Sequence, residues 1–150
     1  MDFPAPLADE RSRTGLFERV LAGTLVAAVV GVWFLAAIID PDPRVIGTHE
    51  QLGLAPCRLL SIFGIPCAFC GMTTAFSHLA HGDPIASIAA QPAGFAIALA
   101  TVPAACAAFT AALSGTVPHW AERITASRFA WTCGLVILIA AWIYKIIVHS

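Results

Sequence analysis

Two cysteines three residues apart, Cys67 and Cys70, form the pattern in this chain that is most able to do chemistry. Thiols at this spacing can close a disulfide, share a metal ion or act as a redox pair. The residues after them predict a short helix over 71–80. The positive end of its dipole would lie beside the thiols, lowering a thiol pKa and favouring the nucleophilic, metal-binding thiolate.

The loop before this pair contributes two more possible ligands, His49 and Cys57. Structural zinc sites take four Cys or His ligands, so one CxxC pair is only half a site. Folding back of the loop would complete a set of three thiols and one imidazole. Zinc is therefore the expected ion, and the predicted ligands are Cys57, Cys67, Cys70 and His49.

Two readings without a metal remain open for the same thiols. A structural disulfide could join Cys57 to Cys67 or Cys70 and staple the loop to the short helix, leaving one thiol over. Alternatively, Cys67 and Cys70 could cycle between dithiol and disulfide as the catalytic pair of a redox protein. The other two cysteines, Cys106 and Cys133, lie in apolar runs and are expected to pack as small hydrophobic side chains.

The histidines of the short helix are poorer candidates for the same ion. From Cys70 to His78 the rise along a helix is about 12 Å. His78 and His81 lie three residues apart on one face, so they could form a separate, weak site.

The composition requires a bilayer around these residues. Apolar residues make up 59% of the 150 residues and charged residues only 11%, whereas about 25% of a typical soluble domain is charged. The net charge is −1 and the basic residues are scattered, which argues against nucleic-acid binding. The first apolar run ends in Asp40-Pro41-Asp42-Pro43 without a cleavage pattern, so it is read as a retained transmembrane helix.

Three apolar runs are long enough to cross the roughly 30 Å hydrocarbon core, over about 20–39, 93–113 and 129–148. The predicted fold is an all-α integral membrane protein: a tail over 1–19 and a single membrane domain over 20–150. A Cys-containing helical or re-entrant insertion at 44–91 lies between the first two spans. A fourth crossing over 59–80 is the alternative, but Gly64, Pro66 and Gly71 argue against a regular span there.

The distribution of basic residues predicts the orientation of the three-span arrangement. Five lie on the side of the N-terminus and three on the other: Arg11, Arg13, Arg19, Arg123 and Arg128 against Arg44, Arg58 and Lys145. The positive-inside rule then places the N-terminus in the cytoplasm. We expect a multi-pass protein of the inner (cytoplasmic) membrane with its cysteines near the outer face.

The motif residues resemble a known family of small bacterial membrane proteins. The pattern Pro66-Cys67-x-x-Cys70-Gly71-Met72-Thr73, followed by Gly82-Asp83, Ala86 and Gln91-Pro92, is similar to that of the DUF2752 family. The segment from Gly47 to Cys57 resembles the family's entry segment. Ala68 stands where relatives often have proline. Because that family has no characterised activity, the resemblance implies a membrane location and a shared cysteine element, not a reaction.

No catalytic set is evident beyond the thiols, so a non-enzymatic role is favoured. The leading hypothesis is a small membrane protein with a His/Cys element that is structural or metal-binding and acts through a partner. The alternatives are a thiol–disulfide or electron-transfer protein at the membrane surface, and an accessory subunit of a larger membrane complex. Expected partners are the lipid bilayer and another membrane protein or a second copy of the chain.

Overall fold

The structure is a computed structural model that describes residues 15–149. Most of the predicted tail over 1–19 therefore lies outside the described residues, and its last four residues already belong to the first helix. The described part is helical throughout. Its elements are α1 (Leu16–Ile38), η2 (a 3₁₀ turn, Thr48–Leu52), α2 (Arg58–Phe63), α3 (Met72–Ala80), α4 (Pro84–Ala90), α5 (Pro92–Ser114), α6 (His119–Ala126) and α7 (Arg128–His149).

Three of these helices are long and apolar enough to cross a membrane: Leu16–Ile38, Pro92–Ser114 and Arg128–Val148. They correspond to the three predicted spans. The segment between the first two is broken into η2, α2, α3 and α4, none of which approaches the length of a span. The predicted class, an all-α fold with three spans and a Cys-bearing insertion, is confirmed.

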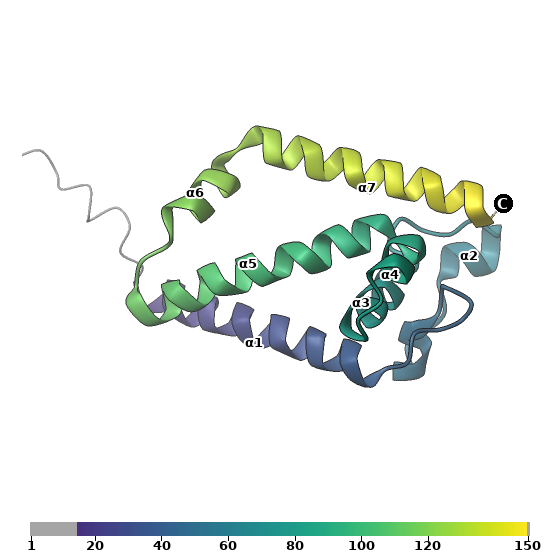
Figure 1. The fold of residues 1–150 in the computed structure, drawn as a ribbon, viewed down its shortest axis with the longest axis horizontal. Helices are drawn as coiled ribbons and strands as arrows, with labels where there is room; N and C mark the ends of the chain where they lie inside the picture. Colours follow the sequence, from purple (N-terminus) through teal and green to yellow (C-terminus); the bar gives the residue numbers. More distant parts are fainter. Residues whose placement is uncertain (1–14, 150) are drawn as a thin grey trace, which may run out of the picture.

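The first two spans, α1 and α5, lie side by side (Figure 1). Trp33 of α1 donates from Nε1 to the hydroxyl of Thr101 on α5 at 2.9 Å. At the other end of the pair, the Arg19 guanidinium donates to the carbonyls of Ala112 and Leu113 in the last turn of α5, at 2.9 Å each. These two carbonyls have no partner within the helix. The pair is thus joined by polar contacts at both ends.

The short helices α3 and α4 pack against one end of this pair (Figure 1). Ala75 of α3 is fully buried and comes so close to α5 that a Cβ at Gly94 would lie 2.9 Å from the Ala75 Cβ. Ser87 of α4 donates to the Ala75 carbonyl at 2.7 Å, and Ser77 of α3 donates to the Ile39 carbonyl. The insertion is therefore held on the bundle by close packing and by buried hydroxyl groups.

The start of α4 is defined by two residues, Asp83 and Pro84. Asp83 precedes the helix, and its carboxylate accepts a hydrogen bond of 2.9 Å from the Ala86 backbone N–H, while Pro84 occupies the first helical position. Both features follow from the unsatisfied N–H groups at a helix start. Because α4 begins here, its last residues, Ala89 and Ala90, come next to α7 and to the segment that carries Cys67 and Cys70.

The third span, α7, is connected differently. It diverges from α5 toward the end of the molecule where α6 lies, and comes close to the insertion at its own C-terminal end (Figure 1). There Trp142 and Tyr144 donate to backbone carbonyls of Pro66 and Ala89, at 3.1 and 3.4 Å. The end of the third span is therefore attached to the segment that carries the cysteines.

Candidate metal centre

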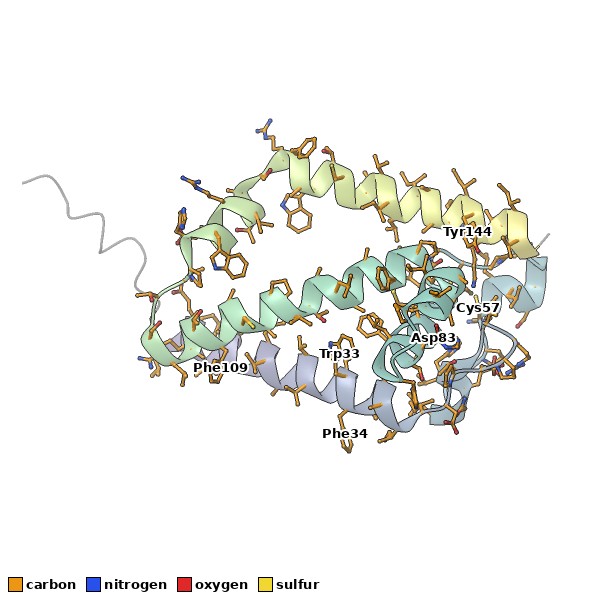
Figure 2. The ribbon with its side chains drawn as sticks, in the orientation of Figure 1. Trp33, Phe34, Cys57, Asp83, Phe109 and Tyr144 are labelled. Atoms are coloured by element: carbon orange, nitrogen blue, oxygen red, sulfur yellow. The ribbon has the colours of Figure 1, made fainter. Side chains whose placement is uncertain are left out.

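Three thiols from different parts of the insertion converge at one end of the bundle. The Sγ atoms of Cys57, Cys67 and Cys70 all lie within 4.8 Å of one another, and those of Cys67 and Cys70 are 3.4 Å apart. Cys57 and Cys67 are half-buried and Cys70 is buried. Figure 2 places Cys57 at the same end of the molecule as Tyr144 of α7. We call these three residues the thiol cluster.

The local backbone explains how two thiols of one short segment face the same point. The Cys70 N–H donates to the Cys67 carbonyl at 3.0 Å, which closes a turn between the two residues. Gly71 follows with a φ of +84° as the residue before α3. A left-handed conformation there suits glycine and lets the chain pass from the turn into the helix. The third thiol, Cys57, stands immediately before α2.

Side chains from distant positions hold the segment from Pro66 to Gly71, which we call the thiol segment, in place. Gln91, which is 0% exposed, donates from Nε2 to the Ala68 carbonyl at 2.8 Å. Trp142 donates to the Pro66 carbonyl on the other side of Cys67. Both carbonyls belong to the thiol segment, so its shape depends on α7 and on the residue that joins α4 to α5. The Gln91 Oε1 atom is buried without a hydrogen-bond partner among the described residues.

A second buried contact fixes the entry loop. The hydroxyls of Thr48 and Thr74 lie 2.9 Å apart, and the Asp42 N–H donates to the Thr48 hydroxyl at 3.0 Å. This pair of hydroxyls joins α3 to η2. Arg44 pairs with Asp42 at 2.7 Å and with Glu50 at 3.1 Å. The loop from 42 to 50 is thus ordered by its own polar groups.

The thiols differ in their acidity. Burial acts to raise the pKa of Cys57, but hydrogen bonds from the Leu60 backbone and with the Cys70 and Cys67 thiols outweigh it and lower that pKa to about 7. For Cys70, burial together with the neighbouring Cys57 and Cys67 thiols raises the pKa to about 12. One thiol thus readily supplies a thiolate at neutral pH, and the other requires a cation before it ionises.

The spacing of the thiols suits a thiophilic metal ion. With Zn–S bonds near 2.3 Å, tetrahedral geometry places ligand sulfurs about 3.8 Å apart. The three sulfurs, separated by 3.4 Å at one pair and by no more than 4.8 Å at any, need only small shifts to reach that spacing. All five cysteines are free, so the disulfide considered above is not found in the part of the chain that the structure describes.

The predicted fourth ligand, His49, does not join the thiol cluster. Its Nε2 lies 3.3 Å from the Ala55 carbonyl oxygen, within its own loop. The reason is the short 3₁₀ turn, in which Thr48 occupies the buried position, with 0% exposure, and bonds to Thr74. The neighbouring side chain is therefore directed elsewhere. A role for His49 as a ligand stays a prediction.

The histidines of α3 also lie outside the cluster. His81 places its Nδ1 2.8 Å from the Ser77 carbonyl one turn earlier. Neither His78 nor His81 belongs to a group of three potential ligands among residues 15–149. A separate, weak site formed by these two histidines stays a prediction.

Sequence reasoning missed the part played by Lys145. The pattern of the third span presents it as an anchor at the membrane surface, but the structure buries it to 1% exposure. Its Nζ donates to the Ala90 carbonyl. A Cβ added to Gly71, next to Cys70, would lie 2.9 Å from that nitrogen. An ionisable residue inside an apolar span was the signal available, because such residues are costly unless they serve a site.

Comparison with known proteins agrees with the resemblance seen in the sequence. The family model described as "Protein of unknown function (DUF2752)" matches residues 57–105. This stretch contains the whole thiol cluster, α2 to α4 and the first half of α5. No curated protein matches the chain. No solved structure matches it either. The family resemblance is therefore confirmed over the residues that form the site, and it brings no activity with it.

Proposed function

We propose that this protein is a small membrane metal-binding protein whose thiol cluster holds one thiophilic ion, of which zinc suits the ligands best. The observation that carries this proposal is the convergence of three unbonded Sγ atoms within 4.8 Å. The site is held by contacts from Gln91, between α4 and α5, and from Trp142 of α7. Three thiolates leave one position of a tetrahedral ion free. Water, His49 after a rearrangement of its loop, or a group from a partner protein can fill it.

The proposed location follows from the basic residues. Arg19, Arg123 and Arg128 lie at the start of α1 and in and after α6, at the end of the bundle opposite the thiol cluster. The positive-inside rule favours this end as the cytoplasmic one. We place the protein in the inner membrane with its N-terminus in the cytoplasm, and the metal centre at the outer face.

Elemental analysis of the purified protein tests the metal. We expect one zinc per chain in the wild type and in the control variant Cys106→Ser/Cys133→Ser. We expect none in the variant Cys57→Ser/Cys67→Ser/Cys70→Ser. A wild-type protein that carries no metal after purification and takes up none from added zinc would contradict the proposal. Adding His49→Ala to the series shows whether His49 supplies the fourth ligand.

A second candidate function is thiol–disulfide exchange at the membrane surface, favoured by the 3.4 Å between the sulfurs of Cys67 and Cys70. In that case two thiols would give up two electrons and two protons to a disulfide of a partner, forming one bridge. Trapping the thiols in intact cells with a membrane-impermeant maleimide tests this candidate. A shift between bridged and free forms when the outside redox state changes supports it, and an unchanging state excludes it.

Action through a partner is part of the proposal. Within residues 15–149 the third span leaves most of its surface uncovered, since only 11% of its most apolar stretch is buried. In a bilayer, lipid, a second copy or another membrane protein can cover this surface. Co-purification in mild detergent, followed by mass measurement of the intact assembly, distinguishes a monomer in lipid from an assembly with further chains.

A further inference from the structure

The buried ammonium group of Lys145 is the feature that the metal proposal leaves unexplained. At 1% exposure it is the largest fully buried side chain among the described residues. An isolated charge in an apolar interior is strongly unfavourable unless it is paired and hydrogen-bonded. Its Nζ donates to one backbone carbonyl, that of Ala90. A single neutral acceptor does not compensate for burying a charge.

No carboxylate of residues 15–149 supplies the missing counter-charge. The ion pairs of residues 15–149 join Arg44 to Asp42 and Glu50, at the entry loop, and none includes Lys145. The thiol cluster comes close to Lys145 instead, through Gly71, the residue after Cys70. The position of a missing Cβ at Gly71 is 2.9 Å from the Lys145 Nζ and 3.0 Å from the Ala90 carbonyl oxygen.

The position of Lys145 is fixed by its neighbours on α7. Trp142 bonds to the Pro66 carbonyl and Tyr144 to the Ala89 carbonyl, so the last turns of α7 contact both the thiol segment and the end of α4. These contacts place the buried ammonium group next to Gly71, the residue after Cys70. A lysine that served only as a surface anchor would extend its ammonium group toward water.

Simple addition of charges identifies the ion that such a site accepts best. Three thiolates and a divalent cation leave a net charge of −1, and one ammonium group brings the total to zero. A monovalent cation would leave −1 in a poorly solvated place. We propose that Lys145 is the charge-compensating residue of the thiol cluster, so that the cluster and the end of the third span together bind a divalent thiophilic cation as a neutral unit.

This inference rests on the proposed metal function and assigns a new part of its site. Lys145 is not a ligand here; it acts on the bound ion through the thiolates. Removing a residue that acts through metal ligands typically weakens metal binding by about 10-fold to 100-fold. The inference therefore predicts a measurable loss of affinity from a change in α7, 75 residues after Cys70 in the chain.

Cobalt(II) is a suitable probe because its thiolate charge-transfer bands report binding and its d–d bands report coordination geometry. We would titrate the full-length, metal-free protein in detergent with Co²⁺ and then compete with Zn²⁺. The variants are Lys145→Met, which removes the charge at similar length, Lys145→Gln, which keeps a hydrogen-bond donor without charge, and Lys145→Arg, which keeps the charge. Ile147→Val is the matched control, because Ile147 lies on the same turn of α7 and is 70% exposed.

We expect Lys145→Met and Lys145→Gln to bind Co²⁺ about 10-fold to 100-fold more weakly with unchanged d–d bands. Lys145→Arg and Ile147→Val should stay within about threefold of the wild type. Wild-type affinity in both uncharged variants would overturn the inference while leaving the metal function intact. Full affinity in Lys145→Gln alone would assign the effect to the hydrogen bond, which also overturns it. Altered d–d bands in both uncharged variants would show a purely structural role. A wild type that binds no Co²⁺ or Zn²⁺ would remove the proposed function and this inference with it.

Discussion

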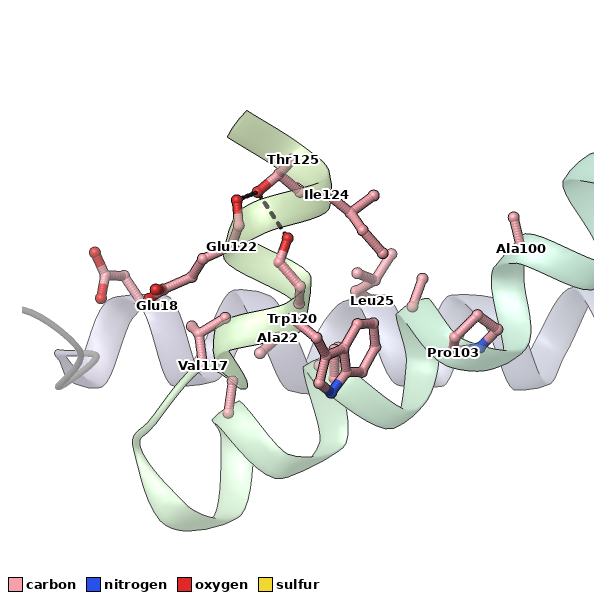
Figure 3. Close-up of a pocket in the computed structure, with 15 residues that line it drawn as sticks. Glu18, Ala22, Leu25, Ala100, Pro103, Val117, Trp120, Glu122, Ile124 and Thr125 are labelled. Atoms are coloured by element: carbon pink, nitrogen blue, oxygen red, sulfur yellow. Dashed lines mark hydrogen bonds between the residues drawn. The ribbon is translucent and has the colours of Figure 1, made fainter. Parts of the chain in front are cut away.

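The two ends of the helix bundle differ in how closely their helices pack and in how many polar side chains they bury. At the thiol end, the insertion and the ends of α1, α5 and α7 meet, and polar side chains are buried in named contacts: Thr48 with Thr74, Ser87 with Ala75, and Gln91 with Ala68. At the other end, α7 departs from α5 and a cavity of about 700 Å³ opens between α1, α5 and α6. Figure 3 shows Leu25 and Trp120 at this cavity.

On its α5 side, that cavity is lined by small apolar residues. Its α5 side consists of Pro103 and five alanines, Ala100, Ala104, Ala107, Ala108 and Ala111. Such a surface does not favour one packing geometry over another, because dispersion contacts depend little on direction. Buried hydrogen bonds, by contrast, are costly to misplace and so fix one geometry. The positions of side chains and backbone are therefore fixed most precisely around the thiols.

The largest effect on this comparison should come from a ligand change at the thiol end. We expect Cys70→Ser to reduce Zn²⁺ affinity by more than about 100-fold, since a hydroxyl is a far poorer zinc ligand than a thiolate. Cys106→Ser in α5 is the matched control and should leave the affinity unchanged. Competition with a zinc-binding dye measures both. Equal affinity in the two variants would show that the thiol end holds no special site.

The difference in acidity within the cluster predicts unequal reactivity in the metal-free protein. With a pKa of about 7, half of Cys57 is thiolate at pH 7, whereas with a pKa of about 12 only about one Cys70 in 10⁵ is. Since the more basic thiolate is the better nucleophile, the rate difference falls to a few hundredfold.

Timed alkylation with iodoacetamide and peptide mass spectrometry measures these rates. Raising the pH from 6 to 8 should speed the labelling of Cys57 until its thiolate fraction saturates. Over the same range the labelling of Cys70 should rise in proportion to hydroxide. Equal labelling of the two at pH 7 would contradict the acidity difference.

A substitution of Gly71, which lies between the turn and α3, should have the next largest effect, on the free energy of unfolding. Gly71 has a φ of +84°, and an added Cβ would lie 2.9 Å from the Lys145 Nζ and 3.0 Å from the Ala90 carbonyl oxygen. We expect Gly71→Ala to lower the free energy of unfolding by about 2–3 kcal/mol, from backbone strain and steric overlap.

Gly134, in the middle of α7, has no atoms near its Cβ position and serves as the control. Gly134→Ala should be neutral or stabilising, because alanine has the higher helix propensity. Unfolding in mixed micelles with increasing SDS gives both values. A Gly71→Ala variant as stable as the wild type would mean that the turn is not constrained as described.

The smallest expected effects distinguish the packing of the two ends. Ala75→Leu adds three carbons where α3 meets α5 with no free space, and should cost about 1–3 kcal/mol. Ala104→Leu adds the same volume at the cavity and should change stability by less than about 0.5 kcal/mol. Thermal unfolding in detergent compares them. Similar costs at both positions would show that the cavity is filled by close contacts in solution.

Much of the fold follows from local sequence. About 20 apolar residues suffice to specify a span, and Asp83 with Pro84 specifies the start of α4 without reference to any other element. The approach of Cys67 to Cys70 is likewise local, because one turn separates them. In each of these cases the interacting groups lie within a few residues of one another.

The rest of the site depends on contacts across the chain. Cys57 was expected near the pair only on the assumption that the loop folds back, and His49 was expected on the same assumption. The structure brings the thiol but not the imidazole, because Thr48 takes the buried position in η2. Lys145 comes next to Ala90 and Gly71 through the docking of α7, which no local pattern encodes.

Whether the thiol cluster binds zinc can be measured by zinc K-edge X-ray absorption of the purified, zinc-loaded protein. We expect one zinc per chain with a first shell of three sulfurs at about 2.3 Å and one lighter atom. A first shell of nitrogen and oxygen only, or a protein that holds no zinc while its three cluster thiols remain free, would contradict it.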